Sequence, residues 1–179
     1  RVEASVTYPA NFQLVAAMNP CPCGHFPDRS RCRCTDGQIT RYLQKVSGPM
    51  LDRIDICVEA SPITYGDIRS SGNNESSREI RARVEQARKI QGERFAGENI
   101  RCNGEMSGRH IRKFCWLGRE EEKFMEEIFK KLALSARMHD RILKVARTTA
   151  DLAEEEKIRL ADLCEAVSYV KSRDKFWGN

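Results

Sequence analysis

Residues 134–152 read LSARMHDRILKVARTTADL, and this stretch indicates the class of fold more clearly than any other part of the chain. Ile142, Val145, Thr149 and Leu152 recur at intervals of three or four residues, which places them on one face of a helix. Ser135 stands just before this pattern and is a residue type that caps the first turn of a helix. The stretch therefore predicts a long helix with one buried face.

Four further stretches around it have helical periodicity. The expected helices cover residues 79–95, 107–115, 120–132 and 160–172. The connections between them are short, which is typical of a small helical bundle. The sequence therefore predicts a mainly α fold.

The beginning of the chain follows a different pattern. FQLVAAM at residues 12–18 predicts a buried strand, central in a parallel sheet, and residues 54–59 alternate enough to predict a second strand. Between them, Thr35 and Gln38 form a capping box for a helix that extends to about Val46. These elements predict an α/β remnant that precedes the helical bundle.

A change in composition divides the two parts. Residues 62–77 are rich in Ser, Gly and Asn, as in a linker. We therefore expect an α/β part over residues 1–61 and a helical part over residues 78–179.

Composition describes a charge-rich globular chain. Hydrophobic residues make up 40% and charged residues 32% of the 179 residues, the net charge is +5, and the mean hydropathy is −0.59. The longest apolar run, residues 12–18, is far shorter than the roughly 20 residues of a membrane-spanning helix. No apolar segment of a signal peptide follows the first charged residues. We expect a cytoplasmic protein with no membrane partner.

Four of the eight cysteines lie close together, in the pattern Cys21-x-Cys23 and Cys32-x-Cys34. Zinc in structural sites takes four ligands in a tetrahedron, usually thiolates, and one looped-out segment can supply all four here. His25 is a spare ligand. The spacing predicts a structural Zn²⁺ knuckle over residues 21–34, and the alternative is a cluster of reduced thiols or two disulfides. The other cysteines are scattered singly, which favours a reducing compartment.

Basic residues suggest a phosphate-bearing partner. Arg outnumbers Lys, and Arg is the better residue for gripping phosphate. Arg29, Arg31 and Arg33 lie on the proposed knuckle, where they could contact the phosphate backbone of a nucleic acid. We treat this contact as a hypothesis from charge density.

Motifs of a self-contained enzyme are absent from the sequence. No Gly-x-x-x-x-Gly-Lys-Ser/Thr loop occurs, no apolar strand ends in an acidic pair of Walker B type, and the three histidines favour no catalytic triad. This chain alone is therefore not expected to catalyse a reaction.

Three runs carry a family resemblance. They are FQLVAAMNPCPCG at 12–24, ITRYLQKVSGPMLDRID at 39–55 and LSARMHDRILKVART at 134–148. Together they resemble the magnesium-chelatase-like AAA+ ATPases of the ComM/YifB family, in the right order and over nearly the whole chain. The resemblance implies the C-terminal part of an AAA+ P-loop NTPase module, with a Cys-rich knuckle insertion and a helical lid. It also implies a longer protein whose Lon-protease-like domain, P-loop and Walker B strand lie before Arg1.

The resemblance also implies roles for three residues. Asn19 matches sensor 1, which orients the attacking water, and Arg53 matches the arginine finger donated to the neighbouring subunit. Arg137 matches sensor 2, a catalytic and nucleotide-binding residue of the lid. The alternatives from the residues themselves are an Asn-Pro turn, an ion pair of Arg53 with Asp52 or Asp55, and a solvated Arg137.

The function implied by this resemblance is that of a motor. The whole protein would be a hexameric ATPase that uses ATP and Mg²⁺ and acts on DNA, as a helicase that promotes branch migration in DNA uptake and recombination. Two alternatives remain, namely a magnesium-chelatase subunit that serves porphyrin metallation and a non-enzymatic zinc-ribbon module that binds DNA. Because its partner strands are missing, the part before residue 62 is expected to be disordered, dimeric or differently packed, whereas the lid folds alone.

Overall fold

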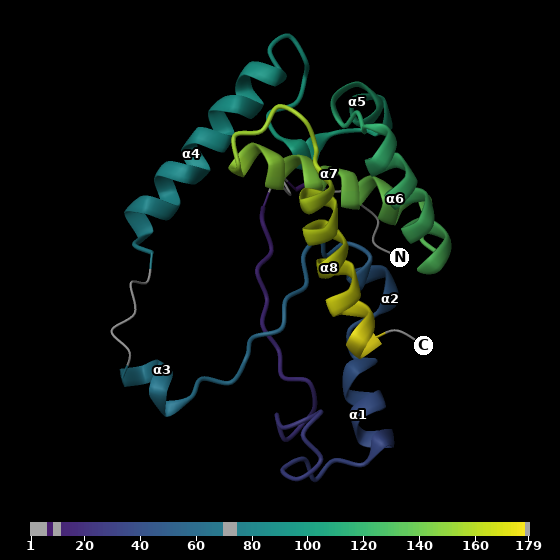
Figure 1. Ribbon diagram of the computed structural model, residues 1–179. Coiled ribbons are helices and arrows are strands. Elements are labelled where there is room, and N and C mark those ends of the chain that lie inside the picture. The colour runs from purple at the N-terminus through teal and green to yellow at the C-terminus, as the bar shows by residue number, and fades with distance from the viewer. Residues whose placement is uncertain (1–6, 9–11, 70–74, 178–179) are drawn as a thin grey trace. The chain divides into compact units, whose positions relative to one another are not determined.

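The computed structural model describes residues 7–8, 12–69 and 75–177, and in these ranges the chain is mainly helical, as predicted (Figure 1). It forms two compact units, residues 1–46 and residues 47–179. None of the described residues belongs to a strand.

The first unit contains the Cys-rich loop and helix α1 (Asp36–Leu43). The predicted capping box is confirmed, because the Thr35 hydroxyl accepts a hydrogen bond from the Gln38 amide and the Gln38 side chain accepts one from the Thr35 amide at 2.9 Å. Ile39 and Leu43 are the buried residues of α1. The local sequence is therefore sufficient to begin this helix.

The two predicted strands are wrong for this structure. Residues 12–18 and 54–59 have no β pairing, and Phe12 and Val15 are 77% and 85% exposed instead of buried. In the second stretch Val58 is 73% exposed. A strand satisfies its backbone groups through neighbouring strands, and the described part of the chain offers none.

The second unit begins with three helices that precede the core. They are α2 (Gly48–Leu51), α3 (Tyr65–Arg69) and α4 (Ser77–Arg94). Helix α3 lies inside the stretch predicted as a linker, and residues 70–74 of that stretch lie outside the described residues. Helix α4 begins with a capping box of Ser76 and Glu79, and it buries Ala87 and Gln91.

The core of this unit is built by the later helices. These are η1 (Asn103–Glu105), α5 (Gly108–Phe114), α6 (Arg119–Lys131), α7 (Ala136–Leu152) and α8 (Leu160–Trp177).

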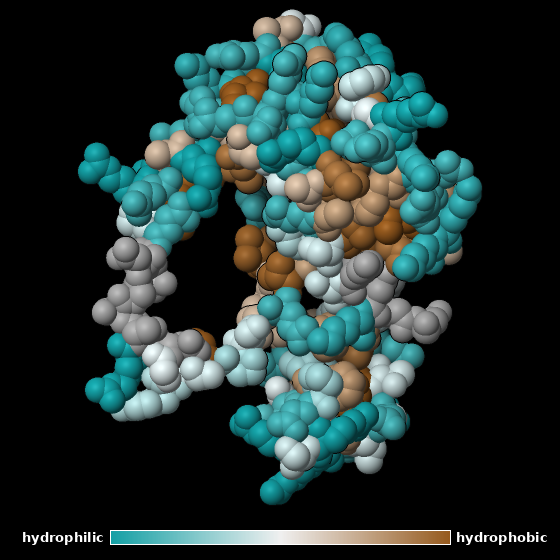
Figure 2. Space-filling view, viewed as in Figure 1, coloured by the Kyte–Doolittle hydropathy of each residue, from teal (hydrophilic) through white to brown (hydrophobic). Residues whose placement is uncertain are grey.

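Helix α7 is the centre of this arrangement, with α8 crossing and packing against it and α4, α5 and η1 also in contact (Figure 1). Ile142, Leu163 and Val167 are at most 3% exposed in the shared core. Hydrophilic side chains cover most of the visible outer face, with apolar side chains showing between them (Figure 2). The predicted helical bundle is thus confirmed, although Leu152 is 38% exposed at the end of α7.

No helix among the described residues has the length and apolar character needed to cross a lipid bilayer.

Candidate functional site

The three arginines near the start and middle of α7 have different environments. Arg137 is exposed in the first turn, whereas Arg141 and Arg147 are 8% and 2% exposed. Arg137 makes no hydrogen bond or ion pair with any residue that the structure describes. It is therefore the arginine of this helix that remains available for a ligand.

The start of α7 is a suitable place for a phosphate. The Ser135 hydroxyl caps the helix by accepting the Met138 amide at 3.2 Å. A cation in the first turn is unfavourable to the helix dipole by itself, but an anion bound there interacts with both the guanidinium and the positive helix end. The position of Arg137 fits a residue that senses a bound phosphate.

Arg53 lies in the turn that follows α2. Its side chain is exposed, and its Nη1 donates to the Pro49 carbonyl at 2.6 Å. The carboxylate of Asp55, one of the two alternative partners, instead lies 2.9 Å from Nε of Arg141. Among the contacts that the structure shows, the Arg53 side chain makes only this hydrogen bond, to a residue four positions earlier in the chain.

Asn19 lies in the first unit, before the Cys-rich loop, and its side chain is exposed. It does not end a strand, since residues 12–18 form none. Its amide lies beside Gly24, whose φ of +81° favours glycine; a Cβ at Gly24 would be in ordinary contact with the Asn19 amide nitrogen, at 3.6 Å. Asn19 therefore lies immediately before the knuckle, with its side chain beside Gly24.

Arg141 reaches from α7 to the segment around Arg53. Its Nη1 donates to the Ile54 carbonyl at 3.1 Å, its Nη2 donates to the Asp52 carbonyl, and its Nε pairs with Asp55. The sequence pattern of α7 does not reveal these contacts, because the partners of Arg141 lie 87 and 89 residues away.

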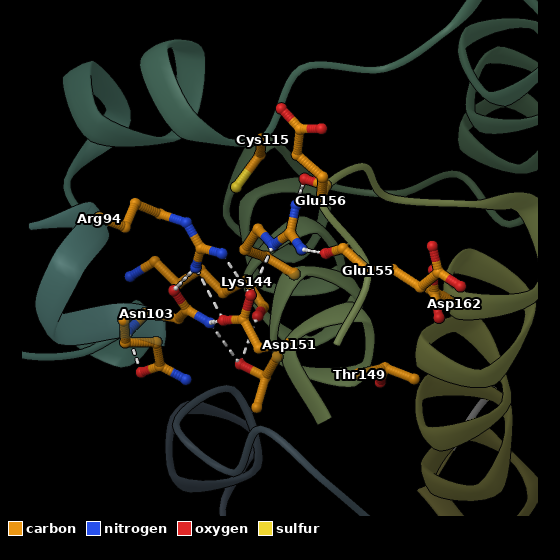
Figure 3. Close-up of polar contacts among 12 residues, drawn as sticks. Arg94, Asn103, Cys115, Lys144, Thr149, Asp151, Glu155, Glu156 and Asp162 are labelled. Atoms are coloured by element: carbon orange, nitrogen blue, oxygen red, sulfur yellow. Dashed lines mark hydrogen bonds and ion pairs between the residues drawn. The ribbon is translucent and has the colours of Figure 1, made fainter. Parts of the chain in front are cut away.

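A second buried network surrounds Asp151, which is fully buried near the end of α7 (Figure 3). Arg94 of α4 binds both of its oxygens, one at 2.7 Å, and Arg147 binds through Nε at 3.1 Å. Asn103 adds a hydrogen bond to Asp151 at 2.8 Å. The network joins α4, η1 and α7, and its role is structural because every group is turned to a protein partner.

Sequence reasoning missed this network. One signal was present: Arg147 and Asp151 are four residues apart, the spacing of an ion pair on one helix face. That pattern usually marks an exposed face, and only the partners from other helices show that it is buried.

The four cysteines of the predicted knuckle come together. Their Sγ atoms all lie within 4.8 Å of one another, with Cys21 3.4 Å from Cys23 and 3.8 Å from Cys32. A zinc tetrahedron with thiolate bonds of about 2.3 Å has sulfur–sulfur edges of about 3.8 Å. The Phe26 amide also donates to Cys21 Sγ at 3.4 Å, which suits a thiolate. This group of residues could hold a metal ion.

The electrostatics of the thiols differ within the cluster. Hydrogen bonds from the backbone of His25 and of Arg33 lower the pKa of Cys23 to about 6, whereas desolvation raises the pKa of Cys34 to about 11. Backbone donors aimed at sulfur favour the thiolate form that binds a metal. All four cysteines are free thiols in this structure, so the two-disulfide alternative is not what it shows.

The three arginines of the knuckle fall into two groups. Arg29 forms an ion pair with Asp36, donates to the Cys34 carbonyl at 3.4 Å and lies over the Phe26 ring. Arg31 and Arg33 instead line an open depression of about 500 Å³ together with Cys23, His25 and Ser30. Arg29 is therefore occupied locally, whereas the other two face solvent.

Comparisons with known proteins agree with this arrangement. The family model for the C-terminal region of magnesium chelatase subunit ChlI matches residues 74–170, and the model for magnesium chelatase subunit ChlI matches residues 1–68. The chain therefore belongs to the magnesium-chelatase-like family of AAA+ proteins, as its resemblance predicted.

Two relatives are similar to nearly the whole of this chain. Competence protein ComM of Haemophilus influenzae is 41% identical over 170 residues, which cover 94% of this chain and 32% of that protein. The uncharacterized protein YifB of Escherichia coli is 43% identical over 171 residues, which cover 94% of this chain and 33% of that protein. The chain thus spans about a third of the length of these relatives.

Proposed function

We propose that this chain supplies the nucleotide-sensing lid and the arginine finger of a longer AAA+ ATPase. The observation that carries the proposal is the state of Arg137, which is exposed and unpaired with described residues at the capped start of α7, while Arg141 and Arg147 are buried. An arginine kept free at a helix N-terminus suits contact with the phosphates of ATP–Mg²⁺. Arg137 acts as sensor 2 in this proposal.

Arg53 and Asn19 complete the proposed set. An arginine finger must reach the γ-phosphate of a neighbouring subunit, and Arg53 is exposed on a short turn from which it can be offered outward. Asn19 would orient the attacking water as sensor 1. The proposal requires an oligomer, and a hexamer is the assembly that the family resemblance implies.

We further propose DNA as the substrate on which the motor acts. One relative is named competence protein ComM, and Arg31 and Arg33 of the knuckle help to line an open depression. Arginines on a metal-fixed loop suit a phosphate backbone. Zinc is the metal that we propose for the four cysteines.

ATP hydrolysis by the full-length protein tests the motor. Arg53→Ala and Arg137→Ala should each lower kcat by about 10³-fold or more, the scale known for arginine fingers. Arg112→Ala, an exposed arginine of α5, is the matched control and should leave kcat unchanged. Normal hydrolysis in both variants would overturn the assigned roles.

Salt-dependent DNA binding tests the substrate. The double substitution Arg31→Ala and Arg33→Ala should reduce the slope of log affinity against log salt by about 2, whereas Arg29→Ala should reduce it less. ATPase stimulated by a porphyrin and not by DNA would support a chelatase subunit instead. DNA binding without any ATPase would support a zinc-ribbon module.

A further inference from the structure

Arg141 connects the helix of the proposed sensor to the turn of the proposed finger. It stands one helical turn after Arg137 on the same face of α7, since residues four apart are neighbours on a helix. Its guanidinium lies against residues 52–55, the segment that contains Arg53. The helix that carries Arg137 and the turn that carries Arg53 are therefore joined through one side chain.

The contacts of Arg141 hold the backbone on both sides of Arg53. The carbonyl of Asp52 precedes Arg53 and the carbonyl of Ile54 follows it, and each accepts a hydrogen bond from the guanidinium. These bonds are well shielded because the Arg141 side chain is only 9% exposed. The planar fork of an arginine presents donors on separate nitrogens in a fixed geometry, which the single ammonium nitrogen of a lysine does not reproduce.

The segment after the turn is also attached to the lid. Ile54, Cys57 and Tyr169 help to line a narrow crevice beside Arg141. Further along, Glu59 pairs with Lys175 of α8 at 2.5 Å. Residues 52–59 are therefore attached to α7 and α8, and they do not belong to a β-sheet that could hold them in place.

We infer that Arg141 is a positioning residue that ties the orientation of the arginine finger to the position of the lid helix. This inference rests on the proposed function, in which Arg137 contacts the phosphates of ATP and Arg53 serves as the arginine finger. A shift of α7 on nucleotide binding would then move the Arg53 turn with it.

The test compares Arg141→Lys with Arg147→Lys in the full-length protein. Both arginines are buried on α7, and both bind two backbone carbonyls and one carboxylate, so Arg147→Lys controls for loss of stability. At a temperature where all variants are folded, Arg141→Lys should lower kcat by about 10- to 100-fold with little change in KM for ATP, as expected for a misplaced catalytic group. Arg147→Lys should leave both parameters near those of the unmodified protein.

A second variant keeps the test decisive if Arg141→Lys fails to fold. Asp55 is 69% exposed, so Asp55→Asn removes one partner of Arg141 without disturbing the core. Asp55→Asn should also lower kcat, but by a smaller factor than Arg141→Lys. In NMR spectra of this chain, it should also shift the Nε–H resonance of Arg141.

A double variant with substitutions at Arg53 and Arg141 distinguishes a positioning role of Arg141 from a general loss of activity. Arg53→Lys should retain a measurable rate, and adding Arg141→Lys to it should cause little further loss, because both changes remove the same contribution. If Arg53→Ala is inactive but Arg141→Lys and Asp55→Asn hydrolyse ATP normally, the positioning role is overturned while the finger stands. If Arg53→Ala retains full activity, the proposed function fails and the inference fails with it.

Discussion

Asp151 shows how one carboxylate determines the packing of three elements. Its two oxygens are shared by Arg94, Arg147 and Asn103, and none of the carboxylate is exposed. Burial lowers the pKa of Arg147, whose charge is therefore costly to keep without the carboxylate. Every member of the network depends on the others.

Removing Asp151 should therefore be strongly destabilising. Asp151→Ala leaves two arginines without their carboxylate, and breaking a buried pair in this way costs about 3–5 kcal/mol. The free energy of unfolding of this chain, measured by urea denaturation, checks the expectation. Glu126→Ala, which breaks an exposed pair with Lys130, is the control and should leave the urea midpoint unchanged; equal effects would contradict the account.

Glu98 predicts a defined dependence of stability on pH. A hydrogen bond from Lys113 at 2.6 Å, followed by the charges of Lys113, Arg109 and His110, lowers the pKa of Glu98 below its ordinary value of 4.5. The stabilisation is therefore complete above pH 4.5 and is lost as pH falls through the lower pKa of the folded state.

The variant Glu98→Gln isolates this contribution. Its urea midpoint should lie below that of the unmodified chain at about pH 6, and the difference should shrink as pH falls below 4.5 and through the lower pKa of the folded state. A difference that stays constant across this range would show that the carboxylate charge is not involved.

At the scale of the element, the Cys-rich loop is the part for which we propose a bound metal. One Zn²⁺ per chain is expected by elemental analysis, and a chelator should release it together with Cys21, Cys23, Cys32 and Cys34 as reactive thiols. The far-ultraviolet circular dichroism should change little, because the hydrophobic cluster around which α4–α8 pack contains no residue of the loop. Cys21→Ser should lose the metal, whereas Cys164→Ser, an exposed cysteine of α8, should retain it.

The helices and the expected strands differ in how they are specified. Helix α7 begins at Ser135 and α1 at Thr35 because the caps are local, within three residues of the amides that they bind. Residues 12–18 have the composition of a strand, but their backbone partners would have to come from elsewhere. Local patterns therefore predicted the helices correctly and the strands wrongly.

At the scale of the whole molecule, the apolar core is unevenly distributed. The hydrophobic cluster contains Phe95 and buried side chains as far as Val170, all in the second unit. Among the described residues of the first unit, Phe12, Leu14 and Val15 are exposed. The second unit should therefore resist unfolding more than the first unit, because apolar burial is the main favourable term in folding.

Limited proteolysis should therefore remove the beginning of the chain first. A resistant product that contains residues 75–177 is expected, and mass spectrometry would identify its ends. Digestion of α5–α8 before residues 12–35 would show that the stable part has been misassigned. This outcome bears on the domain division at residues 62–77, which remains a prediction.

The sequence by itself determined the helices, the knuckle and the family. Capping residues and apolar periodicity act over one or two turns, and the cysteine spacing confines four thiols to one short loop. The positions of α5–α8 and the cluster of Cys21, Cys23, Cys32 and Cys34 were therefore predictable.

Only the tertiary structure decided what each arginine of α7 does. Arg137, Arg141 and Arg147 are alike in sequence, but the partners of Arg141 lie up to 89 residues away, and Arg94 meets Asp151 across 57 residues. The energy of a charged side chain depends on burial and on its partners, which distant segments supply. For that reason the free arginine of the lid could be distinguished from the two buried ones only after the helices had packed.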